Sequence, residues 1–301
     1  MTSMAPLNPA SQEAINRLRA YVPPPTAYDS VPLIRRAAVL LLLYADRQGE
    51  LRVVITIRAK TLSSYAGEAA LPGGRADSLA ETPFQTARRE AWEEIGLPDT
   101  DQPLPRPFAV EHLCELPANL AKTELVVRPC VALLHSSDLL TGEHADPEVS
   151  LIPQLDAREV AAVFTAPFRN FLRLREEAQD ADDPGDWYRG SWSLWHDSNW
   201  RMHQFFVRDK PRTSSQPKRT IEQVEGQEQG QVQRYRVFGM TARMIVDAAR
   251  VAYGEEPEFE HNSHFGDEAM IARLRRMGRL SAMRKPSDGL TRETMKAAKL
   301  S

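Results

Sequence analysis

The chain has 301 residues, of which 42% are hydrophobic and 26% charged, and its formal net charge at pH 7 is −3. This composition is that of a globular protein with a sizeable core, and its mild acidity gives no reason to expect a nucleic-acid-binding surface. No apolar run reaches the length of a membrane span, and the first residues lack the features of a secretory signal. We therefore expect an intracellular soluble protein with no nucleic-acid or membrane partner, and nothing in the composition indicates an oligomeric state.

Residues 1–33 are expected to form an N-terminal extension. It contains a short helix over residues 11–21, followed by three consecutive prolines that are typical of a linker. Two buried strands are predicted next, over residues 37–44 and 51–57, because each is a short apolar run and a polar turn separates them.

A helix is predicted over residues 83–95. Thr82 can act as its N-cap, Pro83 fits the first helical position, and Gln85 stands where a capping box places its return partner. Gly96 suits the left-handed position that ends a helix. The apolar stripe that should pack on the body of the domain consists of Phe84, Ala87, Ala91 and Ile95.

Three carboxylates, Glu90, Glu93 and Glu94, lie on an adjacent arc of this helix. Like charges so close repel one another unless a cation is present, and Mg²⁺ or Mn²⁺ prefers carboxylate oxygens. The preceding turn at Gly73 and Gly74 can bring backbone close to a ligand. The alternative is a solvated acidic helix face, which is the usual explanation of such a run. The glycine turn, the capping box and the terminal glycine together favour a metal site.

Two further residues support this cluster. Arg89 and Glu93 are spaced for an ion pair across one helical turn. Glu81 comes just before the helix, where a carboxylate is favoured by the helix dipole.

Two more strands are predicted after the helix, over residues 108–116 and 125–135, and a later hairpin is predicted over residues 192–207. Residues 160–165 fit a strand or a helix, since a capping box could precede them at residues 156–159. The cysteines, Cys114 and Cys130, lie in the strand-like runs, so we expect buried thiols rather than a disulfide or a zinc site. Four histidines in strand-like contexts, His112, His135, His196 and His203, show no ligand spacing, and the tryptophans near the hairpin are expected to serve packing.

Residues 208–233 are polar with almost no apolar content, so we interpret them as a flexible insertion within a domain that spans residues 34–253. A strong amphipathic helix is predicted over residues 241–253. The tail, residues 254–301, holds one more helix over residues 267–277 and a basic end. Strands interleaved with helices indicate an α/β fold with layers of helix, sheet and helix.

The string from Gly74 to Leu97 resembles the Nudix box, G-x5-E-x7-R-E-U-x-E-E-x-G-U, where U is a bulky apolar residue. Every position from Glu81 onward fits except Ala91, which is small for its U position. The spacing from Gly74 to Glu81 is one residue longer than in the family, and a bulge in that loop would restore the geometry. The resemblance implies a Nudix-type α/β/α sandwich with a mixed β-sheet, in which the box forms a loop-helix-loop.

A second resemblance narrows the subfamily to coenzyme A diphosphatases, whose extra signature is T-x-R-[SA]-x3-R-x3-G-x3-F-P-G-G. Here Thr56, Arg58, Ala59 and Gly67 lead into Gly73 and Gly74, with Ser63 in place of the second arginine and Leu71 in place of the phenylalanine. Residues 238–242 are similar to the W-G-x-T-A segment of the same group, with phenylalanine in place of the tryptophan. The fungal peroxisomal branch is the most similar.

These resemblances imply hydrolysis of the pyrophosphate of coenzyme A or an acyl-CoA to 3′,5′-ADP and 4′-phosphopantetheine, with Mg²⁺ or Mn²⁺ as cofactor. Within the box, Glu90 and Glu94 map to the main metal ligands, Glu93 to a further ligand or a base, and Arg89 to the residue that orients these carboxylates. Arg58, Gly67, Gly73 and Gly74 map to the substrate-binding segment. Glu81 maps to a structural brace, and Glu115 and Glu159 are candidates for a general base outside the box.

Two alternatives remain at this stage. One is a Nudix pyrophosphatase for another nucleoside diphosphate derivative, such as ADP-ribose, a dinucleotide or a capped RNA end. The other is a non-catalytic Nudix-like binding module, which the intact set of glutamates disfavours. The family branch suggests a peroxisomal location, with the cytosol as alternative. Residues 298–300 resemble a peroxisomal signal, but Ser301 follows them, and the receptor reads a free terminal tripeptide.

Overall fold

The computed structural model describes residues 7–59, 67–100, 104–137, 141, 143–147, 151, 160–176, 186–195, 198–208, 234–283 and 293. The insertion expected at residues 208–233 lies outside this part of the chain from residue 209 onward, as does the capping box expected at residues 156–159. Among the described residues, no helix is both long and apolar enough to cross a membrane.

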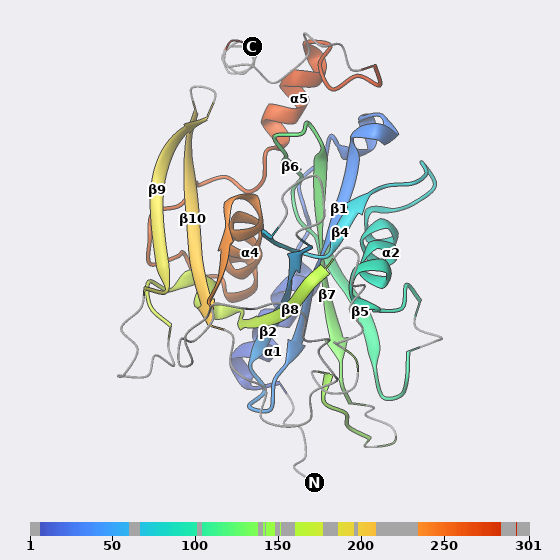
Figure 1. Cartoon of the computed structure of the whole chain (residues 1–301), viewed down its shortest axis with the longest axis vertical. Coiled ribbons are helices and arrows are strands. Elements are labelled where there is room, and N and C mark those ends of the chain that lie inside the picture. Colours follow the sequence, from blue (N-terminus) through green and yellow to red (C-terminus); the bar gives the residue numbers. More distant parts are fainter. Residues whose placement is uncertain are drawn as a thin grey trace, which may run out of the picture.

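A mixed sheet forms the centre of the molecule (Figure 1). Its described strands are β1 (Arg36–Ala45), β2 (Leu51–Arg58), β3 (Ala69–Ala70), β4 (Gly73–Arg75), β5 (Ala109–Glu115), β6 (Asn119–Leu120), β7 (Val126–His135) and β8 (Val160–Pro167). The main path runs β3-β2-β1-β7-β5, with β4 beside β1, β6 beside β7 and β8 beside β2. β1 and β7 are parallel, and the other pairs are antiparallel. The predicted mixed sheet is confirmed.

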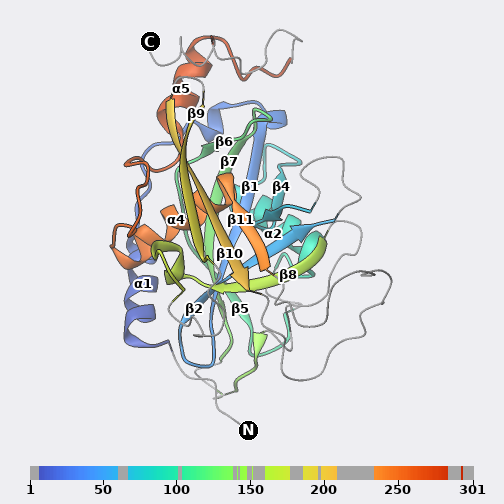
Figure 2. The ribbon, with the colours of Figure 1, turned by 60° about the vertical axis from the view of Figure 1, so that its left-hand side comes forward.

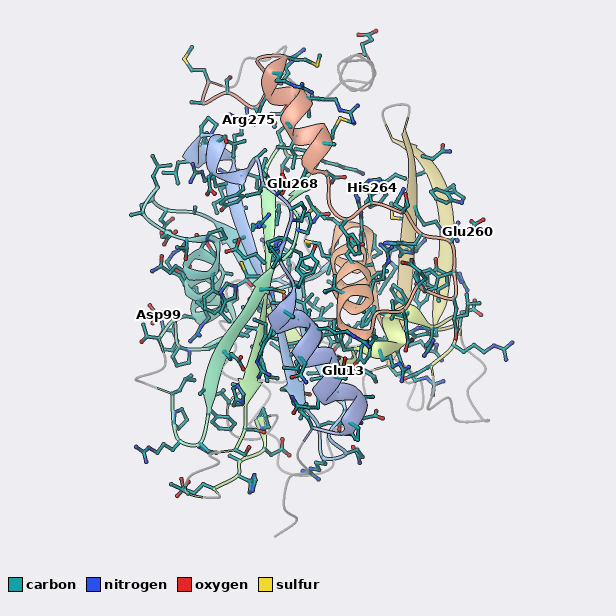
Figure 3. All side chains as sticks on the ribbon, turned by 180° about the vertical axis from the view of Figure 1, so that it is seen from behind. Glu13, Asp99, Glu260, His264, Glu268 and Arg275 are labelled. Atoms are coloured by element: carbon teal, nitrogen blue, oxygen red, sulfur yellow. The ribbon has the colours of Figure 1, made fainter. Side chains whose placement is uncertain are left out.

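Helices cover both faces of this sheet. The helices are α1 (Pro9–Ala20), α2 (Pro83–Ile95), α4 (Gly239–Tyr253) and α5 (Glu268–Arg276), with short 3₁₀ turns η1 (Tyr28–Ser30), η2 (Leu33–Arg35) and η3 (Arg169–Leu172). α2 packs on one face, while α1 and α4 lie together on the other (Figures 1 and 3). Because both faces are covered, β1 and β7 read as almost continuous apolar runs rather than alternating ones.

A second sheet lies beyond α4 and was not predicted as a separate layer. It consists of β9 (Tyr188–Trp195), β10 (Ser198–Arg208) and β11 (Arg234–Phe238), all antiparallel (Figure 2). Phe205 and Val207 of β10 are buried in the same core as α4. The hairpin of β9 and β10 was expected. The third strand, β11, is separated from β10 by a long polar stretch of sequence, so no local pattern predicts that these two strands pair.

The structure defines three features that the sequence predicted only approximately or left open. The first helix begins at Pro9, since Asn8 caps it by accepting a hydrogen bond from the backbone N–H of Ser11. Residues 160–165, which fitted a strand or a helix, form β8 and pair with β2. Both cysteines are buried free thiols, as expected.

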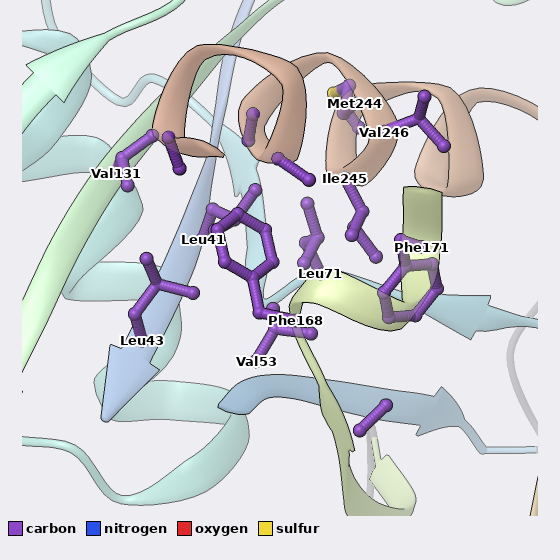
Figure 4. Packing of buried hydrophobic residues seen from close by; sticks show 14 of the residues in the cluster. Leu41, Leu43, Val53, Leu71, Val131, Phe168, Phe171, Met244, Ile245 and Val246 are labelled. Atoms are coloured by element: carbon purple, nitrogen blue, oxygen red, sulfur yellow. The ribbon is translucent and has the colours of Figure 1, made fainter. Parts of the chain in front are cut away.

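The main core joins the sheet to α4. Leu41 and Val131 project from β1 and β7 towards Ile245 of α4, and Phe168 and Phe171 close one end (Figure 4). The N-terminal helix α1 also contributes to this core, because its apolar side is fully buried there. The helix residues involved are Ala14, Ile15 and Leu18.

Candidate active site

The glycine turn that precedes the box helix forms β4, which pairs with the central strand β1. β4 pairs with the start of β1, so that Gly73 lies opposite Val39 and Gly74 opposite Ala38. A Cβ on Gly73, whose φ is 153°, would lie 2.3 Å from the carbonyl oxygen of Ala38. A Cβ on Gly74 would lie 2.4 Å from Oε2 of Glu90. A side chain at Gly73 would therefore clash with the backbone of β1, whereas one at Gly74 would displace the carboxylate of Glu90, against which the turn lies directly.

The box helix α2 has the ends and the packing that the sequence predicts. Thr82 and Gln85 form both halves of the capping box, and Gly96 ends the helix with φ 68°. Ala87 and Ala91 are fully buried against the sheet, beside the almost buried Ile95, while Phe84 is partly buried. This packing fixes the rotation of the helix, so the glutamates face the glycine turn.

The three box glutamates lie in different surroundings. The carboxylate of Glu94 is 4% exposed, accepts a hydrogen bond from the Gly73 N–H at 3.1 Å, and lies 3.6 Å from Nη1 of Arg58. The Glu90 side chain is 15% exposed and lies beside Gly74. The Glu93 side chain is 50% exposed. Two carboxylates therefore meet the glycine turn, and the third lies at its open edge.

Arg89 connects these carboxylates to the loop. Its guanidinium donates to Glu81 and to Glu90, each at 2.9 Å, and to the carbonyl oxygen of Arg75 at 2.7 Å. It also lies 3.7 Å from Oε1 of Glu93. Burial works to lower the pKa of Arg89, but the hydrogen bonds to Glu81 and Glu90 outweigh it and raise the pKa. A permanently charged side chain thus orients the glutamates on both sides of it.

Glu81 braces the loop rather than facing the glycine turn. Besides the contact with Arg89, it accepts hydrogen bonds from the backbone N–H of Asp77 and the hydroxyl of Thr86, both at 3.0 Å. Burial would raise the pKa of Glu81, but these three donors together lower it. The loop from Gly74 to Glu81 is one residue longer than in the Nudix pattern, but Glu81 still lies within hydrogen-bonding distance of Arg89.

Comparisons with known proteins address the family of this chain. A family model of the NUDIX domain matches residues 34–129. The chain is 29% identical over 285 residues to peroxisomal coenzyme A diphosphatase 1 of Saccharomyces cerevisiae, a match that covers 88% of this chain and 83% of that relative. It is 28% identical to the mitochondrial Nudix hydrolase 15 of Arabidopsis thaliana, over 75% of this chain and 61% of that relative.

A bacterial relative decides the family. The uncharacterized Nudix hydrolase NudL of Cronobacter sakazakii is 32% identical over 183 residues, which cover 58% of this chain and 80% of that relative. The chain belongs to the Nudix hydrolase family. The resemblance of the glutamate-rich string to the Nudix box is thereby confirmed.

The box of this Nudix hydrolase has the donor chemistry of a magnesium site. Among the described residues, no group of three or more His, Cys, Asp or Glu side chains is placed so that it could hold a metal ion, so Glu90, Glu93 and Glu94 do not form a three-ligand site. Mg²⁺ does not require one, because it is commonly bound by one or two carboxylates together with waters and substrate phosphates. Glu90 and Glu94 are the two carboxylates that could serve in this way, and the absent side chain of Gly74 leaves room for the Glu90 carboxylate. The residues present therefore fit the divalent metal that the family uses.

The predicted substrate segment adjoins the box. Arg58 ends β2, and its backbone carbonyl accepts a hydrogen bond from the Gly67 N–H at 3.0 Å. Gly67 has φ 74°, a conformation that favours glycine. Nε of Arg58 is buried and has no hydrogen-bond partner. The structure thus brings Arg58 to Glu94, whereas Ser63 lies outside the described residues.

The two candidates for a general base outside the box have different outcomes. Glu115 accepts a hydrogen bond from Arg128 at 2.9 Å, and Arg128 reaches Glu268 at 3.2 Å with its other end. The carboxylate of Glu115 is therefore engaged in an ion-pair network that extends to Glu268 of α5. Glu159 lies outside the described residues.

A buried polar chain was missed from the sequence. Tyr188 bonds to His203 at 3.0 Å, His203 to His261 at 2.7 Å, and His261 to Asp247 at 2.9 Å. His203 is fully buried, and burial lowers its pKa to about 2. Because His203 is two residues before the buried Phe205 on β10, both lie on the same face of the strand, and this period of two could have indicated the burial of His203. Its partner His261 is 58 residues away, and no sequence pattern connects the two.

Proposed function

We propose that this Nudix hydrolase cleaves the pyrophosphate of coenzyme A or an acyl-CoA, giving 3′,5′-ADP and 4′-phosphopantetheine or its acyl derivative. The observation that supports it best is the contact between Arg58 and Glu94, 3.6 Å apart. Arg58 belongs to the segment that resembles the coenzyme A signature, and Glu94 belongs to the box. Two motifs that are separate in the sequence therefore meet at one place, beside Gly73.

The names of relatives give independent support. Both the yeast relative and a Caenorhabditis elegans relative, 31% identical over 137 residues, are named peroxisomal coenzyme A diphosphatases. The C. elegans match covers 45% of this chain and 50% of that relative, whereas the yeast match covers most of both chains.

Each box residue has a role in this proposal. Glu90 and Glu94 would hold Mg²⁺ or Mn²⁺, which when bound neutralises phosphate charge and activates water. Arg89 fixes the carboxylate of Glu90 through a 2.9 Å hydrogen bond and approaches Glu93. Glu93, the most exposed of the three, is free to rotate towards the metal as a further ligand or to accept a proton from water.

The substrate-binding residues act on the phosphates. The unpaired, buried Nε–H of Arg58 offers a charge-assisted hydrogen bond to a phosphate oxygen. Gly67 donates its backbone N–H to the carbonyl oxygen of Arg58. Gly74 leaves room for the carboxylate of Glu90 beside the glycine turn, where the phosphates would meet the metal.

A substrate panel tests the proposal. The kcat/KM of the purified chain with Mg²⁺ or Mn²⁺ would be measured for coenzyme A, acetyl-CoA, ADP-ribose, a diadenosine polyphosphate and capped RNA. We expect coenzyme A or its acyl derivative to be cleaved at least about tenfold more efficiently than the others, because the second motif contributes contacts that the other substrates lack. Equal or better turnover of ADP-ribose, a dinucleotide or capped RNA would assign the site to that substrate instead.

We further propose the peroxisome as the compartment, because the yeast and nematode relatives are named peroxisomal. The Arabidopsis relatives are named mitochondrial and chloroplastic, so these organelles and the cytosol are the alternatives to distinguish. Fractionation of cells that express the untagged chain should place it with peroxisomal catalase. Recovery in the cytosolic fraction alone would contradict this assignment.

A further inference from the structure

The C-terminal part of the chain differs in charge from the rest. Residues 268–301 contain nine Lys and Arg against three Asp and Glu, a net charge of +6. Since the whole chain has a net charge of −3, the first 267 residues carry −9. The expectation that no membrane partner exists relied on the absence of a membrane-spanning apolar run, which does not test for docking at a bilayer surface, and the net charge of the whole chain conceals this asymmetry.

One side of α5 is fixed to the body of the protein. Ile271 and Leu274 are fully buried in a cluster that includes Tyr28. At the start of the helix, the carboxylate of Glu268 accepts hydrogen bonds from the backbone N–H groups of Ala27 at 2.9 Å and Ala118 at 2.8 Å. Figure 3 shows Glu268 next to the body and Arg275 farther along the helix. α5 is therefore a rigidly mounted helix at one end of the molecule (Figure 1).

The other side of α5 and the turn after it combine cations with exposed apolar side chains. Arg276 is exposed, and Met277 and Met283 are 37% and 73% exposed. No ion pair joins Arg275 or Arg276 to another residue in the part of the chain that the structure describes. The helix dipole favours cations in the last turn, but it gives no reason for two large apolar side chains beside them.

A surface of cations and unpaired apolar side chains matches the boundary of an anionic bilayer. Clusters of Lys and Arg are attracted to anionic lipid headgroups, and neighbouring apolar side chains can enter the acyl boundary. Single-stranded nucleic acid also attracts cations, but its bases stack on aromatic side chains. Residues 268–301 contain no Phe, Trp or Tyr, and methionine has no partner on a phosphate backbone.

We propose that the outer surface of α5 and the following turn, formed by Arg275, Arg276, Met277 and Met283, docks on membranes that carry anionic lipids. The cations provide long-range attraction to the bilayer surface, and the methionines provide short-range insertion. Docking of this kind does not depend on which substrate the active site cleaves.

Vesicle sedimentation with the full chain tests the proposal, using phosphatidylcholine vesicles with and without phosphatidylserine. We expect binding only to the anionic vesicles, weakening as salt is added. The double variant Arg275→Gln/Arg276→Gln should lower the partition coefficient by about 30-fold, since each cation near such a surface contributes about fivefold. The variant Met277→Ser/Met283→Ser should weaken binding while the salt dependence stays as in the wild type.

A matched control has the same change in charge outside the α5 surface. Arg47→Gln/Arg189→Gln removes two arginines whose side chains are 63% and 65% exposed, and it should bind as the wild type does. All variants should unfold at the wild-type temperature, because the substituted side chains lie at the surface. Equal losses in both arginine variants, or no preference for anionic vesicles, would overturn the proposal. So would binding of duplex DNA or RNA that exceeds vesicle binding and is lost in the α5 variant.

Discussion

The two sides of the molecule use similar polar residues in opposite ways. On the α2 side, Glu90 and Glu93 remain partly open to solvent, and one arginine holds several carboxylates around a glycine turn. On the far side, the hydrogen-bonded series of side chains that begins at Tyr188 and ends at Asp247 is buried in the core between α4 and the second sheet. Both regions are well hydrogen-bonded, but only the first has carboxylates that a ligand can reach. Access, rather than the number of polar groups, distinguishes the candidate active site from the scaffold.

The largest expected effect is the loss of activity in Glu94→Gln. The amide keeps the size of the side chain and an oxygen that can accept the Gly73 hydrogen bond, but it removes the charge that a metal requires. We expect kcat to fall about 10³-fold, because the metal contributes several kcal/mol to the reaction. Steady-state kinetics at saturating metal would measure this. The control Glu13→Gln, at a side chain that is 57% exposed on α1, should leave kcat unchanged.

The far side should respond in stability instead of activity. His203→Ala opens a cavity in the core and leaves Tyr188 and His261 without their partner, so the free energy of unfolding should fall by about 3 kcal/mol. Urea denaturation would measure it. The exposed His144→Ala should change stability by less than about 0.5 kcal/mol. If His203→Ala lost activity while keeping its stability, the distinction between the two regions would be wrong.

A smaller effect is expected for Gly74→Ala. The new Cβ would lie 2.4 Å from the Glu90 carboxylate, which must move away from the glycine turn. Because a carboxylate at the end of a side chain can move easily, we expect a loss of about 30-fold in kcat/KM with a change in stability below about 1 kcal/mol. Thermal unfolding and kinetics on the same sample distinguish this outcome from misfolding.

The smallest effect, for each unit of pH, is a decrease in the free energy of unfolding at acidic pH that the buried His203 causes. His203 has its pKa lowered by burial to about 2, so above the ordinary value of 6.5 both states are neutral and pH has no effect through it. As the pH falls below 6.5, His203 becomes protonated in the unfolded chain but stays neutral in the folded chain, so the free energy of unfolding decreases. The contribution is about 1.4 kcal/mol per pH unit.

Comparison of wild type with His203→Gln between pH 4.5 and 6.5 isolates this contribution. Glu111, whose pKa is lowered to about 2 chiefly by its hydrogen bond with Arg19, starts to affect stability only below its ordinary value of 4.5. In urea denaturation, the wild type should therefore lose stability more steeply than the variant over this range. Parallel curves for the two proteins would show that His203 takes up a proton in the folded state.

The sequence predicted the box helix accurately because its determinants are local. Thr82, Pro83 and Gln85 start it, Gly96 stops it, and the apolar stripe sets its rotation, all within fifteen positions. The contact of Arg58 with Glu94 could be anticipated only through resemblance, because it depends on the pairing of β2, β1 and β4. Hydrophobic periodicity reports which face of a strand is buried, but it does not report which strand lies beside it.

The far side was harder to predict for the same reason. β10 joins β11 across residues 209–233, and His203 meets His261 from a segment beyond α4. The spacing of histidines along the chain reports only local metal sites, whereas His203 and His261 belong to a hydrogen-bonded chain made by tertiary contacts. Local patterns therefore identified the box helix, and long-range packing determined what surrounds it.

The most direct test of the central claim is identification of the products formed from coenzyme A by mass spectrometry, with Mg²⁺ present or removed by chelation. The proposed reaction predicts equal amounts of 3′,5′-ADP and 4′-phosphopantetheine from the wild type with Mg²⁺, and neither product after chelation or from Glu94→Gln. Intact coenzyme A under conditions in which the same preparation hydrolyses ADP-ribose would contradict the proposal.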